Sequence, residues 1–126
     1  IIVAALDRHP SILSIEQPEL HLHPKMQVAL ADLFIEESKD TDRIFILETH
    51  SEHLMLRLLR RIRETYEESN IDAYHWRSLV TEDISVYYVE QTPQGMRATY
   101  LKIDEEGEFE DRWPQGFFDE RAEELF

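Results

Sequence analysis

The segment that decides the fold reads Ser11-Ile-Leu-Ser-Ile-Glu-Gln-Pro-Glu-Leu-His-Leu-His-Pro24. Its first part, residues 11–15, is a short apolar run rich in isoleucine, with a proline on either side. Such a run is typical of a buried strand, although a buried helical segment has the same pattern. The residue before Pro10 is pushed out of the helical region, so residues 1–8 are expected to be the end of a helix.

A helix and a second strand follow this segment. Pro24 suits the first turn of a helix, where its missing N–H costs little. Five residues then follow helical spacing: Met26, Leu30, Leu33, Phe34 and Glu37. The helix is expected to run to about Lys39, before the turn-forming residues 40–42. Residues 43–47 form another short apolar run. Two strands joined by a helix make a β-α-β unit, so the sequence predicts a parallel sheet covered on both faces.

The rest of the chain predicts a second helix, a hairpin and an acidic tail. Thr49 or Ser51 can cap the helix, which is expected to fray near residues 68–70. Its apolar stripe consists of Leu54, Met55, Leu58, Leu59 and Ile62. Residues 84–103 alternate around the turn Thr92-Pro-Gln-Gly95, which predicts an antiparallel hairpin. The acidic tail carries aromatic residues that disordered segments usually lack, so we expect it to dock on another surface. These are Phe109, Trp113, Phe117, Phe118 and Phe126.

Composition excludes several classes of function. The 126 residues carry 27 acidic and 13 basic side chains, a formal net charge of −14, and no cysteine. The lack of cysteine excludes a disulfide scaffold, a Cys-ligated zinc finger and a catalytic thiol. The negative charge opposes bulk attraction to nucleic acid or to an anionic membrane. The apolar run at residues 1–6 is too short for a signal peptide or a membrane span, so we expect a soluble, cytoplasmic protein with no membrane partner.

Acidic and polar residues gather where the first predicted strand ends. Glu16 is followed by Gln17 and Glu19, and ligands bind at the carboxyl ends of parallel strands in α/β sheets. Carboxylate oxygens there can hold Mg²⁺ directly or through water, and in phosphoryl transfer Mg²⁺ bridges phosphate oxygens. The alternative is that these acids only lie beside a helix N-terminus, which the helix dipole favours.

Histidines follow both predicted strands. His21 and His23 form an H-x-H pair, which fits a transition-metal site weakly and a loop cap or loop hydrogen bond better. His50 follows the second strand, at the same predicted edge as Glu16. A histidine there can donate a hydrogen bond to a phosphate oxygen, or it is simply an ordinary residue at a helix start.

Together these motifs resemble ABC-type ATPases, and more closely the OLD-like and SMC-like AAA ATPases of bacteria. Residues 4–19 resemble the end of the signature helix and the Walker B strand, and residues 47–51 resemble the switch-histidine strand. Residues 113–126 resemble the C-terminal domain of unknown function DUF3696. The resemblance implies an α/β fold: a partial P-loop NTPase (ABC-ATPase-like) sheet of parallel strands with flanking helices, then the hairpin and the acidic aromatic tail. It assigns residues 1–75 to the ATPase half and residues 76–126 to the hairpin and DUF3696-like region.

The resemblance also implies ATP and Mg²⁺ as cofactors and a role for each site residue. Glu16 takes the place of the Walker B acid that holds Mg²⁺ through water, and His50 that of the switch histidine at the γ-phosphate. Gln17 stands where these ATPases have the catalytic glutamate. Glutamine can orient a water but cannot accept its proton, so hydrolysis would be slow or would depend on Glu19. Two histidines lie in the loop that faces a second ATPase subunit: His21 and His23.

The phosphate-cradling motif G-x-x-x-x-G-K-[S/T] does not occur in the chain, whose three glycines all lie beyond residue 94. We therefore expect the phosphate and signature loops upstream of Ile1, and ATPase activity in the full-length protein only. Three hypotheses follow. The chain is part of an ATPase that works as a homodimer or higher oligomer, part of a hydrolysis-poor ATP-dependent dimerisation switch, or a module that docks an effector protein through residues 105–126.

The expectation of a nucleic-acid partner rests on the arginines of the second predicted helix. Arg57, Arg60 and Arg61 share one face of it, and Arg63 lies close by. The alternative, favoured by the 27 acidic residues, is a solvated face paired with acids such as Glu64, Glu67 and Glu68. Relatives of this architecture often act on nucleic acid or in phage defence, which keeps DNA as an expectation for the full-length protein.

Overall fold

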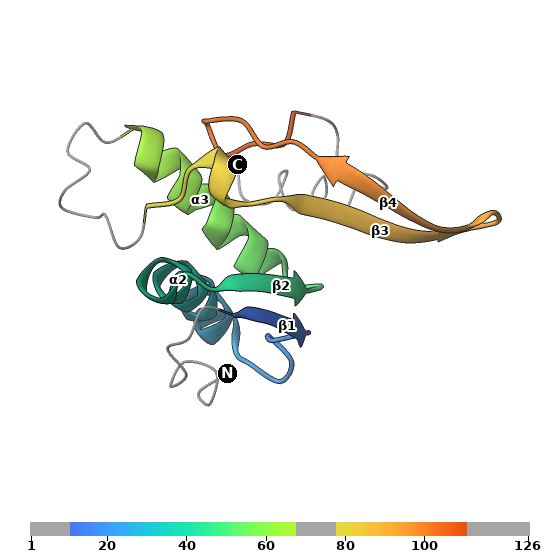
Figure 1. Cartoon of the computed structure of the whole chain (residues 1–126), viewed down its shortest axis with the longest axis horizontal. Coiled ribbons are helices and arrows are strands. Elements are labelled where there is room, and N and C mark those ends of the chain that lie inside the picture. Colours follow the sequence, from blue (N-terminus) through green and yellow to red (C-terminus); the bar gives the residue numbers. More distant parts are fainter. Residues whose placement is uncertain (1–10, 68–77, 111–126) are drawn as a thin grey trace.

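The structure is a computed structural model that describes residues 11–67 and 78–110. Figure 1 shows how its elements are arranged, in this order along the chain: β1 (Ile12–Glu16), α2 (Pro24–Thr41), β2 (Ile44–Glu48), α3 (Glu52–Glu67), a short 3-10 helix (Thr81–Asp83), β3 (Val86–Thr92) and β4 (Gly95–Leu101). The helix expected over residues 1–8 and the tail beyond residue 110 lie outside the described residues.

The predicted β-α-β unit is present. Strands β1 and β2 pair in parallel, with Ile12 opposite Ile44 at one end and Glu16 opposite Glu48 at the other. Helix α2 connects them and runs two residues beyond the predicted end at Lys39. It stops because Asp42 adopts a left-handed conformation, φ 52°, which cannot continue a right-handed helix.

The parallel sheet is covered on one face only within the described part of the chain. On that face Ile15, Phe45 and Leu47 pack against the hydrophobic core. On the opposite face Ile12 and Ile44 are 66% and 60% exposed. The prediction of a sheet covered on both faces is thus met on one side, because the described helices lie against that side alone (Figure 1).

The core forms where α2 crosses α3. The buried side chains are Leu30, Ala31, Phe34 and Ile35 from α2 with Leu54, Met55, Leu58 and Ile62 from α3. The stripe predicted for the second helix is therefore confirmed, apart from Leu59, which is partly buried. Met26 is 55% exposed, because it lies in the first turn of α2 ahead of the buried stripe. No helix of the described residues is long and apolar enough to cross a membrane.

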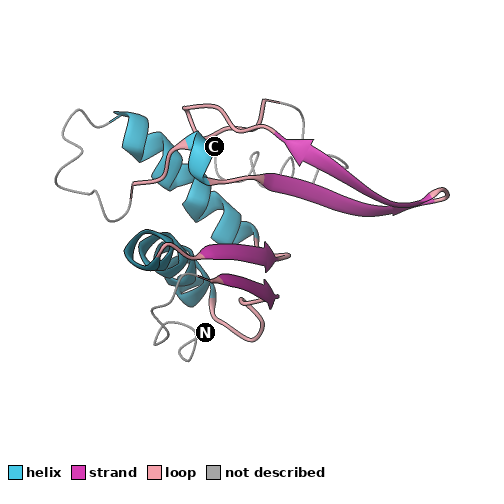
Figure 2. Ribbon diagram, in the orientation of Figure 1, coloured by secondary structure: helices cyan, strands magenta, loops and turns pink. Residues whose placement is uncertain are grey.

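Strands β3 and β4 form the predicted antiparallel hairpin, which extends away from the helices (Figure 2). Thr92 pairs with Gly95 across the turn, and Gly95 takes φ 113°, a backbone conformation open to glycine. The hairpin is shorter than the predicted span of residues 84–103. Ile103 lies beyond β4 and instead forms an isolated antiparallel bridge with Phe109.

The segment after the hairpin folds back onto α3. Ile103 belongs to the same core cluster as the residues of α2 and α3, as does Leu79. At Gly107, φ 73°, a Cβ atom would lie 2.3 Å from the carbonyl oxygen of Leu59. The backbone of this turn therefore lies directly on α3, and the described residues on both sides of the predicted boundary at residue 75 share one core. The division into two domains stays a prediction.

Candidate functional site

The candidate site lies at the edge of the sheet where β1 and β2 end side by side (Figure 1). Glu16 and Glu48 are the last residues of the two strands, lie opposite each other, and are both exposed. The N–H of Gln17 donates to the carbonyl oxygen of Glu48 at 2.7 Å, which extends the ladder by one residue. Gln17 then takes a left-handed conformation, φ 47°, so the chain turns away from the strand at this point.

Residues 17–23 form a compact loop with its own backbone hydrogen bonds. Leu20 N–H donates to Gln17 O at 3.1 Å, and Leu22 N–H donates to Glu19 O at 3.0 Å. His21 is exposed with φ 64°, and His23 ends the loop as the N-cap of α2. The sequence therefore predicted correctly that a loop histidine acts as a cap.

The H-x-H motif does not form a metal cage. His23 Nδ1 accepts a hydrogen bond from the N–H of Lys25 at 3.2 Å. Among the described residues, no group of three or more His, Cys, Asp or Glu side chains could hold a metal ion. The structure supports the capping interpretation of His23 over the transition-metal one.

Glu19 and His50 are brought together by the fold. Glu19 is only 9% exposed, and its Oε1 accepts a hydrogen bond from the backbone N–H of His50 at 2.9 Å. Its second oxygen, Oε2, is buried and has no hydrogen-bond partner among the described residues. The side chain of His50 is exposed at the edge of the sheet. The sequence placed both residues near this edge but did not indicate that the carboxylate binds the backbone of the histidine.

A second side-chain pair joins α2 to the start of α3. Ser51 Oγ donates to Gln27 Oε1 at 2.5 Å and accepts from the N–H of Leu54 at 3.0 Å. Ser51, one of the two predicted caps, thus binds the first turn of α3. Gln27 also donates through Nε2 to the carbonyl oxygen of Leu22 at 3.0 Å. Gln27, a polar residue in the first turn of α2, was not predicted as a site residue.

The residues at the ends of β1 and β2 fit a magnesium ion that also binds phosphate. Mg²⁺ keeps several waters and is usually held by one or two carboxylates together with phosphate oxygens, so it needs no cage of protein ligands. Glu16 and Glu48 present two exposed carboxylates in register at this edge. Glu48 was not predicted as a site residue, although its position at the end of the second strand is the signal that could have identified it.

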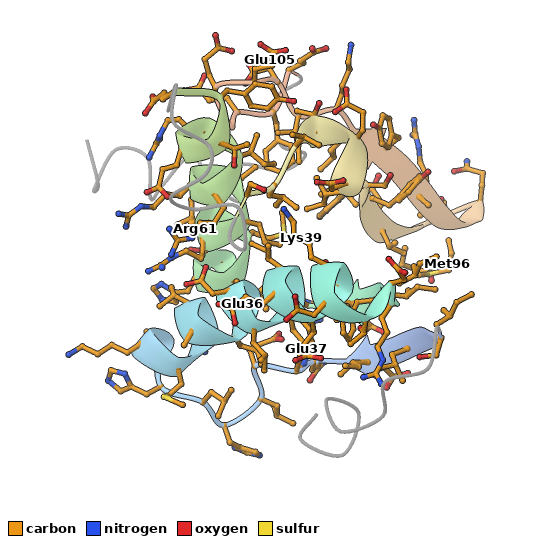
Figure 3. The ribbon with its side chains drawn as sticks, turned by 60° about the vertical axis from the view of Figure 1, so that its left-hand side comes forward. Glu36, Glu37, Lys39, Arg61, Met96 and Glu105 are labelled. Atoms are coloured by element: carbon orange, nitrogen blue, oxygen red, sulfur yellow. The ribbon has the colours of Figure 1, made fainter. Side chains whose placement is uncertain are left out.

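The arginine face of α3 is occupied by acids of the same chain. Asp32 on α2 accepts from Arg57 at 3.1 Å and from Arg61 at 2.8 and 3.0 Å. Glu64 accepts from Arg60 at 2.7 Å and from Arg61 at 2.8 Å. Figure 3 shows Arg61 on the part of α3 that lies beside α2. Glu64 is thus one of the acids that the sequence named as partners, Asp32 is an additional one, and Glu68 lies outside the described residues.

Two members of these ion pairs have pKa values shifted from their ordinary values: Arg61 and Glu64. The hydrogen bond to Asp32 is the main cause that raises the pKa of Arg61, against the opposing effect of burial. Burial alone would raise the pKa of Glu64, but the hydrogen bonds from Arg60 and Arg61 outweigh it and lower this pKa below its ordinary value. Arg61 and Glu64 are therefore both charged in the folded protein at neutral pH, and the pair between Arg61 and Asp32 connects α3 to α2.

Two protein-family models match parts of the chain. Residues 4–55 match the model of the AAA ATPase domain, and residues 79–126 match the model of a protein of unknown function, DUF3696. The first match contains both strands of the candidate site. No match was found among curated proteins or among solved structures. The chain is therefore similar to an AAA ATPase domain over residues 4–55 and to DUF3696 over residues 79–126.

Proposed function

We propose that the full-length protein binds ATP and hydrolyses it with Mg²⁺, and that this chain supplies the γ-phosphate side of the site. One observation carries the proposal. The in-register ends of β1 and β2 bring Glu16, the last residue of β1, and the loop that contains His50 to the same sheet edge. The hydrogen bond from Gln17 N–H to Glu48 O joins the two strands there. The match of residues 4–55 to the AAA ATPase domain supports the same activity.

Each residue at this edge has a chemical role in the proposal. The exposed carboxylate of Glu16 would hold Mg²⁺ through water, and bound Mg²⁺ neutralises phosphate charge. The exposed imidazole of His50 would donate a hydrogen bond to the γ-phosphate. Gln17 would orient the attacking water through its amide. We propose that the loop with His21 and His23 faces a second subunit, so that ATP is enclosed between two copies.

A second candidate function is an ATP-dependent dimerisation switch with little turnover. Two observations favour it. Gln17 cannot accept a proton, and Glu19, the other residue considered as a base, is buried with Oε1 bonded to the N–H of His50. In this case ATP binding would bring two subunits together and slow hydrolysis would separate them.

Steady-state hydrolysis and ATP affinity of the full-length protein test the proposal. We expect Glu16→Ala to abolish turnover and His50→Ala to lower it by about a hundredfold. Glu105→Ala, an exposed acid away from the sheet edge, is the matched control and should leave turnover unchanged. Wild-type turnover that persists in both site variants would overturn the proposal.

The variant Gln17→Glu separates the two candidate functions. A large gain in turnover, with ATP-dependent dimerisation of the wild type in analytical ultracentrifugation, would identify the switch. Robust wild-type turnover that this substitution leaves unchanged would identify the ordinary ATPase. An absence of both ATP binding and ATP-dependent dimerisation would contradict both candidates.

A docking role for the C-terminal region stays a proposal for residues beyond 110. Ile103 and Phe109 form an isolated β-bridge and pack on the hydrophobic core of the same chain. Their side chains are therefore occupied by contacts within the chain and are not free to bind an effector. Removal of residues 111–126 from the full-length protein should abolish binding of an effector and leave ATP binding intact; unchanged binding of that effector would contradict the docking role.

A further inference from the structure

We propose that Glu19 is a positioning residue, whose buried carboxylate holds the backbone of His50 in place and couples it to the loop of residues 17–23. The proposal rests on the proposed function, in which His50 contacts the γ-phosphate. The observation behind it is the 2.9 Å hydrogen bond from His50 N–H to Glu19 Oε1, made by a glutamate that is only 9% exposed.

The bond to His50 is the middle one of three connections that residues 48–51, at and after the end of β2, make to the loop after β1 and to the first turn of α2. On one side, Gln17 N–H donates to Glu48 O at 2.7 Å. On the other, Ser51 Oγ donates to Gln27 Oε1 at 2.5 Å. Glu48, two residues before His50, and Ser51, the residue after it, are therefore each held by a hydrogen bond that does not involve Glu19. The contact from Glu19 acts on the backbone between these anchors, where the direction of the imidazole is determined.

A carboxylate is a costly choice for a purely structural contact at this position. Burial of a charged group is unfavourable unless hydrogen bonds compensate it, and Oε2 of Glu19 has no partner among the described residues. In return, a charged acceptor makes a stronger hydrogen bond to an N–H group than a neutral one does. Glu19 thus makes a strong hydrogen bond to the backbone amide of His50 through Oε1, while its Oε2 stays buried without a partner among the described residues.

The same residue connects His50 to the exposed part of the loop. The backbone oxygen of Glu19 accepts from Leu22 N–H at 3.0 Å, and between these two residues lie Leu20, which is 58% exposed, and His21, which is exposed with φ 64°. A protein surface that presses on Leu20 and His21 would displace the backbone of Glu19 and, through its carboxylate, the backbone of His50. Contact by a second subunit at this loop is thereby linked to the histidine.

The test compares Glu19→Ala, which removes the acceptor, with Glu19→Gln, which keeps an uncharged acceptor oxygen. Glu37→Ala is the matched control. Glu37 also has a buried Oε2 without a partner among the described residues, but it lies on α2, and the N–H of His50 donates to Glu19 instead. Amide hydrogen exchange at His50 is measured in the full-length protein without nucleotide. We expect exchange to rise about tenfold in Glu19→Ala and to be unchanged in Glu37→Ala. In Glu19→Gln we expect a smaller rise, because the neutral oxygen makes a weaker hydrogen bond than the carboxylate.

Hydrolysis then shows whether the position of His50 matters for function. We expect Glu19→Ala to lower kcat about tenfold with the KM for ATP unchanged, and to have no further effect in a His50→Ala background. Restored kcat in Glu19→Gln would support positioning by the hydrogen bond. Additive effects of the two alanine substitutions on kcat would overturn the proposal.

The exchange measurement distinguishes failure of this proposal from failure of the proposed function. Exchange at His50 that is unchanged in Glu19→Ala would overturn the positioning role whether or not the protein hydrolyses ATP. A protein with the expected exchange but no ATP binding would instead contradict the proposed function, and with it the role of His50 at a phosphate. If Glu19→Ala does not fold, the proposal is tested with Glu19→Gln alone. Amide exchange at His50 that is more than about tenfold faster in Glu19→Gln than in the wild type would then overturn it.

Discussion

Asp32 on α2 accepts two hydrogen bonds from the guanidinium of Arg61 on α3, from Nε at 2.8 Å and from a terminal nitrogen at 3.0 Å. This fork geometry is the strongest form of an arginine–carboxylate contact, and both side chains are largely buried. Arg57 adds a third bond to the same carboxylate at 3.1 Å. The crossing of α2 and α3 is therefore held by apolar packing and by this ion pair.

Removal of Asp32 should destabilise the protein strongly. Asp32→Ala leaves the guanidinium of Arg61 buried, with Glu64 as its one remaining charged partner among the described residues. We expect a loss of about 3 kcal/mol in the free energy of unfolding. The control is Glu110→Ala, which breaks the exposed pair with Lys102, at 3.4 Å, and should cost less than about 1 kcal/mol. Urea unfolding measures both. Equal effects of the two substitutions would contradict the role given to Asp32.

Glu64 should make part of the stability dependent on pH. Hydrogen bonds from Arg60 and Arg61 lower the pKa of Glu64 in the folded protein below its ordinary value of 4.5. Its contribution is therefore fully present above pH 4.5 and is lost as the pH falls through the lowered pKa. We expect the difference in unfolding free energy between wild type and Glu64→Gln to be largest near neutral pH and to shrink in acid. A difference that stays constant with pH would exclude this linkage.

The turn that contains Gly107 should not accept a side chain. A Cβ atom there would lie 2.3 Å from Leu59 O, a backbone atom that cannot rotate away, and φ is 73°. We expect Gly107→Ala to lower the unfolding free energy by about 3 kcal/mol. Gly95→Ala is the control, because a Cβ at Gly95 has no atom within 4 Å and meets only backbone strain, about 1–2 kcal/mol. Thermal unfolding of the two variants decides whether this close approach holds the turn on α3.

The paired acids at the end of the sheet should repel each other in the absence of a cation. Glu16 and Glu48 lie opposite each other on neighbouring strands, and like charges in this arrangement are unfavourable. We expect Glu48→Gln to stabilise the metal-free protein by up to about 1 kcal/mol at low salt, with less effect at high salt. Glu90→Gln, which removes an acid opposite Arg97 in the hairpin, should instead be neutral or destabilising. Stabilisation by both substitutions would point to net charge as the cause.

Much of the secondary structure follows from local sequence. Pro24 marks the start of α2, and the turn at Thr92–Gly95 places the hairpin, because turn conformations depend on a few adjacent residues. The apolar stripe of α3 follows its helical period. The strands β1 and β2 each lie within one residue of their expected positions. These predictions needed no knowledge of distant contacts.

The sequence by itself therefore determined the order of the elements and the edge of the sheet at which Glu16 and His50 lie. Only the tertiary structure decided which side chains meet there. Glu19 and His50 are 31 residues apart, and Asp32 and Arg61 are 29 apart. Backbone preferences act over a few residues, whereas these contacts depend on the strand register and on the crossing of α2 and α3, which the packing of the whole core sets.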